Sequence, residues 1–323
     1  MKKPKVSILL PVYNAEKYLK ECLDSLLIQS FVDFEVIALN DASTDASLEI
    51  LLEYKKYDDR IKIYNNELNL KLPSNLNKGI IISNSPLIAR MDADDVCLPG
   101  RLQAQYDFMQ RNQNVVVCGS WTEVYETGAV WRWPVSNDAI RTAMLFNCPL
   151  AHPTVMFRKN AIISINGYSK LFGNAEDYDL WERLAHNSHA FFANIPDVFV
   201  RYRLHPSVDR GSYKLRQRYF ANAVRLRQLH RLGLSPNSAD LEAHLLLARV
   251  NMLKGIREVK ICNSWAKRLE NANKIFEFYN SKEMEYYIRR SMLGAFSELV
   301  YRRYVPDVIK YVRKKSKNLF AFK

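Results

Sequence analysis

Short apolar runs alternate with helical patterns through the first 95 residues of this 323-residue chain. Four of the apolar runs predict buried strands, at residues 6–10, 34–39, 61–64 and 87–91. Between them, apolar residues recur at helical spacing over residues 14–27, 46–57 and 73–82. Strands and helices that alternate at these lengths predict an α/β fold, with a mostly parallel sheet and helices on both of its faces.

Polar and acidic residues follow three of these strands. Asn14 follows the first strand, where we expect it to cap the next helix, and Asp41 follows the second. The fourth strand runs directly into the acidic segment at residues 92–95. Because the carboxyl ends of parallel strands lie at one edge of the sheet, we expect Asn14, Asp41 and the acidic segment to converge on one ligand-binding crevice.

The rest of the chain divides into a mixed part and a helical part. Further strand patterns lie at residues 115–133, 154–157 and 198–204. From about residue 211 helical patterns continue to the end, with a Gly-Leu-Ser-Pro break at residues 233–236. We therefore predict two domains, an α/β domain at residues 1–210 and a basic helical C-terminal region at residues 211–323.

Positive charge is concentrated in the last third of the chain. Residues 1–204 carry 22 basic and 24 acidic side chains, whereas residues 205–323 carry 25 basic and 10 acidic ones. The net charge of +13 therefore belongs to the C-terminal region. This asymmetry favours a polyanion or an anionic membrane surface as the partner of that region, with solvated Lys and Arg faces as the structural alternative.

Hydrophobicity and cysteine spacing restrict the setting of the protein. No run of 18 or more apolar residues occurs, and the N-terminal apolar run is too short for an export signal. The five cysteines are scattered without a C-x-x-C pair, which favours reduced thiols over zinc sites or disulfides. We expect a cytoplasmic protein that is at most peripheral on the inner face of the cell membrane.

The acidic segment that follows the fourth strand reads Asp-Ala-Asp-Asp at residues 92–95. Carboxylates at a sheet edge are hard oxygen ligands that suit Mg²⁺ or Mn²⁺ held jointly with a substrate diphosphate. A bound cation also removes the repulsion between acids that are so close together. A solvated acidic turn is the alternative, but the position directly after a strand favours a metal site.

Two other acidic positions are suited to binding and catalysis. Asp41 is placed to accept hydrogen bonds from a ribose hydroxyl or a base edge. Glu176 and Asp177 open a predicted helix, where a carboxylate is either a favourable first-turn acid or a base for an attacking hydroxyl. No G-x-G-x-x-G, G-x-x-x-x-G-K-[ST] or G-x-S-x-G motif occurs, which disfavours dinucleotide binding, P-loop binding and acyl transfer.

Four motifs occur in a fixed order along the first two thirds of the chain. They are VSILLPVYN at 6–14, NDASTD at 40–45, MDADD at 91–95 and EDYDLW at 176–181. Together they resemble the signatures of glycosyltransferase family 2, over roughly residues 5–205. The resemblance implies a GT-A-like fold with a Rossmann-like sheet, a nucleotide-sugar donor, a divalent metal (Mn²⁺ or Mg²⁺) and inversion at the anomeric carbon.

The resemblance assigns roles residue by residue. The donor-binding positions are Pro11, Tyr13, Asn14, Asp41, Lys71 and Asp92. The metal positions are Asp94, Asp92 and His205. The catalytic positions are Asp177, as the base that deprotonates the acceptor hydroxyl, and Glu176 beside it. Lys71 departs from the pattern, because many family members have glycine there, and it either contacts donor phosphate or is solvated.

The predicted function is metal-assisted transfer of a sugar from a nucleotide diphosphate-sugar, most often a UDP-sugar in this family, to a hydroxyl acceptor. The resemblance further implies a saccharide or lipid-linked saccharide acceptor in cell-surface polysaccharide or lipopolysaccharide assembly. Two alternatives remain, a nucleotidyltransferase with a similar sheet and a basic nucleic-acid-binding protein. No Gly-rich basic loop follows the first strand and no nucleic-acid-binding motif is visible, which disfavours both.

Overall fold

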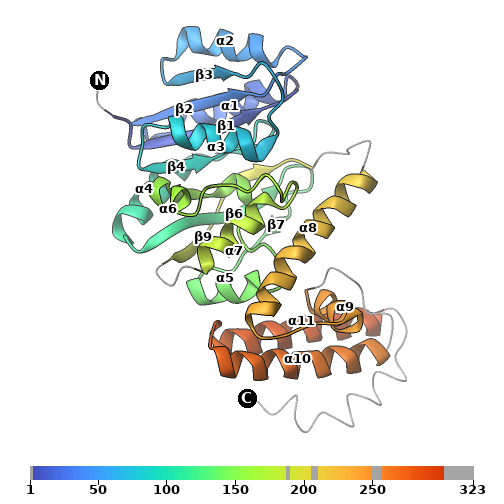
Figure 1. The fold of residues 1–323 in the computed structure, drawn as a ribbon. Helices are drawn as coiled ribbons and strands as arrows, with labels where there is room; N and C mark the ends of the chain where they lie inside the picture. The colour runs from blue at the N-terminus through green and yellow to red at the C-terminus, as the bar shows by residue number, and fades with distance from the viewer. Residues whose placement is uncertain (1–2, 187–189, 205–209, 249–255, 302–323) are drawn as a thin grey trace. The chain divides into compact units, whose positions relative to one another are not determined.

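A computed structural model of the chain describes residues 3–186, 190–204, 210–248 and 256–301 (Figure 1). The chain forms two compact units, the first from Met1–Ile140 with Cys148–Asn222 and the second from Arg141–Asn147 with Ala223–Lys323. Each unit has its own hydrophobic core. The predicted domain boundary at residue 210 stays a prediction.

The first unit is built on a nine-stranded sheet in the order β3-β2-β1-β4-β8-β6-β9-β5, with β7 paired to β6. The strands are β1 (Val6–Val12), β2 (Phe34–Asn40), β3 (Ile61–Asn65), β4 (Leu87–Arg90), β5 (Val96–Cys97), β6 (Val115–Val124), β7 (Val130–Trp131), β8 (Met156–Arg158) and β9 (Phe191–Tyr202). The strands β3, β2, β1 and β4 are parallel, which confirms the predicted α/β fold. Strand β8 pairs antiparallel with β4 and β6, so the sheet as a whole is mixed.

The order of the strands places a ligand site between β1 and β4. The chain proceeds from β1 outward to β2 and β3, and then returns to the other side of β1 to form β4. In open α/β sheets, a crevice forms outside the carboxyl ends of the strands where the direction of strand order reverses. Val12 pairs with Asn40 and Leu9 with Arg90, so the loops that follow β1, β2 and β4 leave the same edge of the sheet.

Helices cover both faces of the parallel strands. The helices of this unit are α1 (Leu19–Leu27), α2 (Ser47–Tyr57), α3 (Leu72–Ile82), α4 (Arg101–Arg111), α5 (Asn137–Met144), α6 (Lys159–Ile163) and α7 (Glu176–Ala185), with α5 shared with the second unit. Ile8 and Leu10 of β1 share one core with buried residues of α1, α2 and α4. Successive strand residues face opposite sides, and α3 packs near Leu9, where a Cβ on Gly79 would lie 3.0 Å from Leu9 Cδ2.

The predicted cap at Asn14 is wrong. Helix α1 begins at Leu19, and its N-cap, Tyr18, makes no side-chain capping bond. Asn14 instead has a left-handed backbone with φ 49°, a conformation that asparagine tolerates well. Its Oδ1 accepts a hydrogen bond of 2.8 Å from the backbone N–H of Thr44. Asn14 therefore joins the loop after β1 to the loop after β2 rather than starting a helix.

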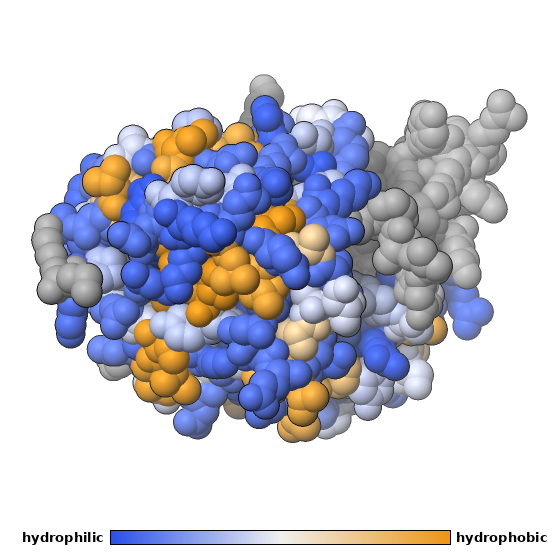
Figure 2. Space-filling view, turned by 90° about the horizontal axis from the view of Figure 1, so that it is seen from above, coloured by the Kyte–Doolittle hydropathy of each residue, from blue (hydrophilic) through white to orange (hydrophobic). Residues whose placement is uncertain are grey.

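One edge of the sheet is formed by β3. Figure 2 looks down on the side of the molecule where Figure 1 shows β3 and α2, and hydrophilic residues there surround separate groups of hydrophobic ones. The second residue of β3, Lys62, is exposed. A lysine on an edge strand discourages pairing with the edge of another sheet.

The second unit contains the helical part that the sequence predicts. Its helices are α8 (Arg210–Arg231), which begins in the first unit, α9 (Ser238–Leu247), α10 (Ile256–Phe276) and α11 (Ser281–Tyr301). The predicted break is confirmed, because Gly233 has a φ of 68° just after α8, and Asn237 caps α9. Among the described residues, no helix is long and apolar enough to cross a membrane. The basic segment at residues 302–323 lies outside the described residues.

Candidate active site

A crevice of about 710 Å³ lies at the carboxyl ends of β1, β2 and β4. It is lined by seven of the predicted site residues, namely Pro11, Tyr13, Asn14, Asp41, Lys71, Asp92 and Asp94. The expected convergence of Asn14, Asp41 and the acidic segment is therefore observed. His205 lies outside the described residues, and Glu176 and Asp177 belong to α7, beside the crevice rather than in its lining.

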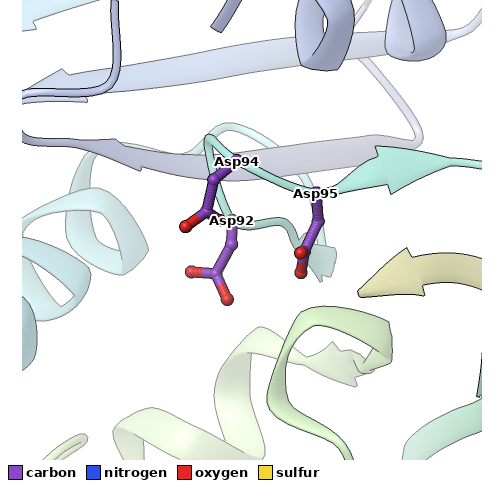
Figure 3. Close-up of side chains that lie close together, drawn as sticks. All are labelled: Asp92, Asp94 and Asp95. Atoms are coloured by element: carbon purple, nitrogen blue, oxygen red, sulfur yellow. The ribbon is translucent and has the colours of Figure 1, made fainter. Parts of the chain in front are cut away.

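Three carboxylates gather at the turn that follows β4 (Figure 3). Asp92, Asp94 and Asp95 each offer a carboxylate oxygen, and these oxygens all lie within 4.8 Å of one another. The guanidinium of Arg90 forms an ion pair with Asp92 from within β4. Burial, followed by the charges of Asp92 and Asp94, raises the pKa of Asp95 to about 9.

The donor set fits a divalent cation. Carboxylate oxygens are the ligands that Mg²⁺ and Mn²⁺ prefer, and the turn places more negative charge together than Arg90 alone can balance. Asp95 Oδ2 is buried, and no hydrogen-bond partner for it lies in the described part of the chain. Burial also raises the pKa of Asp92, and the positive charge of Arg90 only partly opposes this effect.

Arg203, at the end of β9, holds the acidic turn in place. Its backbone N–H donates a hydrogen bond of 2.8 Å to Asp95 Oδ1, and its Nε donates one of 3.0 Å to the carbonyl of Asp94. Its guanidinium lies 4.2 Å from the ring centroid of Tyr18 and 3.8 Å from that of Tyr125. A terminal nitrogen also pairs with the carboxylate of Glu21 at 2.6 Å. Arg203 therefore holds the turn through the backbone carbonyl of Asp94 and the side chain of Asp95.

Sequence reasoning missed Arg90, Arg203 and Cys148. Arg90 carried a usable signal, because a cation in an otherwise apolar strand has to find a buried partner. The other two carried none, because Arg203 and Cys148 meet the acids only through tertiary folding. All five cysteines are free thiols, and Cys148 is the one that lies beside a predicted catalytic residue.

Asp41 shapes one wall of the crevice. Its Oδ1 accepts hydrogen bonds of 2.8 Å from the backbone N–H of Leu70 and from the side-chain amide of Asn66. Its Oδ2 accepts a bond of 3.0 Å from the backbone N–H of Lys71. The buried carboxylate thus holds the loop between β3 and α3 against the end of β2. The role of Asp41 toward a nucleotide stays a prediction.

Three residues in the loops around the crevice have a positive φ. Asn14, Ala42 and Lys71 have φ values of 49°, 58° and 66°. Lys71 combines its positive φ with a ψ of 158°. Residues other than glycine rarely adopt this combination, so the backbone of Lys71 is strained. This conformation gives a physical reason for the glycine that many family members have at this position. The chain tolerates the strain in order to present a lysine at the crevice.

We expect Lys71→Gly to raise the free energy of unfolding by about 1 kcal/mol, because glycine relieves the backbone strain. The same substitution should raise the KM for the sugar donor about tenfold if the ammonium contacts a phosphate. Differential scanning calorimetry and donor titration measure the two effects separately. Lys71→Ala is the matched control, since it removes the ammonium without relieving the strain. Equal stability of the two variants would contradict the interpretation of the backbone.

Asp177 lies half-buried at the start of α7. Its Oδ1 accepts a hydrogen bond of 2.7 Å from the backbone N–H of Tyr178, and the Cys148 thiol donates to its Oδ2 across 3.6 Å. Burial raises the pKa of Asp177, and the charge of Asp177 helps to raise that of Asp92. Burial and then Asp177 raise the pKa of Glu176 to about 7. Carboxyl groups with raised pKa values are suited to accept a proton at neutral pH.

A mixed sheet whose parallel strands reverse their order at an acidic turn agrees with the GT-A-like fold that the sequence predicts. The chain belongs to glycosyl transferase family 2, whose family model matches residues 7–172. It is 34% identical over 205 residues to the O-antigen biosynthesis glycosyltransferase WbnJ of Escherichia coli, covering 62% of this chain and 80% of that protein. The protein is therefore an enzyme of this family.

Two solved structures have a similar fold. The S. aureus TarS fragment 1–349 in complex with UDP-GlcNAc superposes with a TM-score of 0.55 at 18% identity, covering 93% of this chain and 92% of that one. The mannosyltransferase PcManGT from Pyrobaculum calidifontis, in complex with GDP-Man and Mn²⁺, gives a TM-score of 0.52 at 15% identity, covering 99% and 82%. At these identities the likeness concerns the fold alone, and it agrees with the predicted GT-A-like architecture.

Proposed function

We propose that the protein transfers a sugar from a nucleotide diphosphate-sugar to a hydroxyl acceptor, with inversion at the anomeric carbon. The observation that carries this proposal is the crevice in which Asn14 and Asp41 meet Asp92 and Asp94 of the carboxylate cluster, at the carboxyl ends of β1, β2 and β4. The crevice is large enough for a nucleotide-sugar, at about 710 Å³.

In the proposed mechanism, the loops after β1 and β2 bind the nucleotide, and Lys71 approaches the diphosphate. Asp92 and Asp94 would hold a divalent cation, with His205 as a further candidate ligand. When bound, that cation would neutralise negative charge on the departing nucleoside diphosphate. Asp177 takes the proton from the acceptor hydroxyl while the acceptor oxygen attacks the opposite face of the anomeric carbon. A single displacement needs one base and no carboxylate nucleophile, and it inverts the configuration.

The relatives support a role in surface-polysaccharide assembly. WbnJ acts in O-antigen biosynthesis, which supports a saccharide acceptor here. A relative from Escherichia coli that is 29% identical over 221 residues is a UDP-Gal:alpha-D-GlcNAc-diphosphoundecaprenol beta-1,3-galactosyltransferase, which supports a lipid-linked saccharide. UDP-GlcNAc in the TarS structure supports a UDP-sugar, whereas GDP-Man in PcManGT keeps a GDP-sugar as the second donor to test. The Mn²⁺ of the latter structure supports Mn²⁺ as the first metal to supply.

A thermal-shift panel of nucleotide sugars tests this function. Because a ligand that binds only the folded state stabilises it by mass action, the correct donor should raise the Tm more than its free sugar or a mismatched nucleotide does. The shift should increase when Mn²⁺ is present. With the selected donor, release of the nucleoside diphosphate supports glycosyl transfer. Release of pyrophosphate, or no stabilisation by any donor, would contradict the proposal.

A further inference from the structure

A second surface of the first unit combines exposed apolar and basic side chains. It consists of Lys170 and Leu171 in the loop before α7, and Lys214, Leu215, Arg216 and Tyr219 on α8, and we call it the basic-apolar patch. A groove of about 700 Å³ runs between the loop and the helix. The three apolar side chains of the patch are exposed, Leu171 by 77%, Leu215 by 70% and Tyr219 by 71%.

The first turns of α8 lack the buried stripe of an ordinary surface helix. Every residue from 211 to 219 is exposed, although an amphipathic helix normally covers one face. The rings of Phe172 and Phe220, 5.9 Å apart, connect the loop to the next turn of the helix. The sequence of α8 contains no acidic residue between Arg210 and Arg231. An exposed apolar face of this kind, set among cations, indicates an anionic and partly apolar partner.

We propose that the basic-apolar patch docks on the surface of an anionic lipid bilayer. Leucine and tyrosine side chains that are exposed side by side can enter the boundary between headgroups and acyl chains. Lys170, Lys214 and Arg216 would meet the negative headgroups around them. Nucleic acid would use the cations but would leave the exposed leucines in water, so the lipid surface satisfies both properties of the patch.

The patch lies beside the predicted base. The loop that carries Lys170 and Leu171 leads directly into α7, which begins at Glu176. Tyr213, on the first turn of α8, hydrogen-bonds to Asn174 in the same loop. Docking at this face would bring Asp177, the predicted base, close to a hydroxyl acceptor carried by the membrane. This consequence rests on the proposed function, whereas the docking itself does not.

Vesicle co-sedimentation of the full-length protein tests the docking. At low salt the wild type should sediment with vesicles containing phosphatidylglycerol and remain in solution with pure phosphatidylcholine. The double variant Leu215→Ser/Tyr219→Ser should bind at least about tenfold more weakly, because two apolar anchors are lost. The double variant Lys170→Glu/Arg216→Glu should lose at least as much and should show a smaller dependence on salt, because the cations supply the electrostatic part of the binding.

Matched variants outside the patch control for changes in charge and apolar area. Ile81 is 72% exposed on α3 and Lys55 and Lys56 are exposed on α2, so Ile81→Ser and Lys55→Glu/Lys56→Glu should bind as the wild type does. Equal losses in patch and control variants would overturn the proposal, as would unchanged binding in both patch variants. Wild-type binding to an oligonucleotide but not to vesicles would also overturn it.

The docking and the proposed function can fail independently. Transfer to a water-soluble acceptor analogue should be the same in the patch variants and the wild type, since these residues do not line the crevice. An enzyme that is active on the analogue but does not bind vesicles disproves the docking alone. A protein that binds vesicles but no nucleotide sugar disproves the proposed function alone.

Discussion

Replacing Asp177 by asparagine is expected to lower the rate of sugar transfer by between about 10²-fold and 10⁴-fold, the usual contribution of a positioned base. The amide keeps the size of the carboxylate and can still accept the hydrogen bond from the backbone N–H of Tyr178. We therefore expect the fold to persist. Donor binding should stay nearly intact, because Asp177 does not belong to the lining of the crevice.

Two measurements separate these effects. The initial rate with the true acceptor reports the loss of the base, and calorimetric titration with the donor reports binding. Glu176→Gln is the comparison, since it changes the neighbouring carboxylate, which is buried. If Asp177 is the base, the Asp177→Asn variant should be the slower of the two. Turnover equal to that of the wild type in Asp177→Asn would exclude the assigned role.

Removing Asp94 is expected to have the second large effect. Asp94→Ala takes away a carboxylate from the cluster whose oxygens lie within 4.8 Å of one another. We expect the rate to fall by about 10²-fold to 10³-fold, because the developing charge of the leaving group loses its stabilisation. The rate that remains should no longer respond to added Mn²⁺ or Mg²⁺.

The stability of Asp94→Ala distinguishes a lost ligand from a damaged fold. Asp94 adds to the negative charge that raises the pKa of the buried Asp95, so its removal relieves repulsion. In the absence of metal, the variant should therefore unfold at a temperature no lower than that of the wild type. Asp59→Ala, at an exposed acid in the turn between α2 and β3, is the control. A variant with full metal dependence would rule out Asp94 as a ligand.

The sequence predicted the part of the fold in which local pattern and chain order agree. Strands β1 to β4 and helices α2 and α3 lie within a few residues of their predicted positions, because short apolar runs and helical spacing each determine one element. The order β3-β2-β1-β4 then brings Asn14, Asp41 and the acidic turn to one edge. That step needs only the rule for ligand sites in parallel sheets.

The missed features depend on contacts between distant segments. Arg203 meets Asp94 and Asp95 because β9 pairs with β5, the edge strand that directly follows the acidic turn, and no local pattern reveals this pairing. Helix α4 escaped prediction because two of its four buried residues are polar or charged, namely Arg101 and Gln105, which bond to each other. An apolar period cannot identify a helix that buries charged groups.

Asp41 has a consequence for the kinetics of the enzyme. Its carboxylate already holds the backbone of Leu70 and Lys71 and the side chain of Asn66 before any donor arrives. The conformational entropy of this wall is therefore lost during folding rather than during binding. Because these loop residues are already held in place, donor binding does not have to order them. Its association should follow a single exponential whose rate rises linearly with donor concentration, without the plateau that a slow closing step would impose.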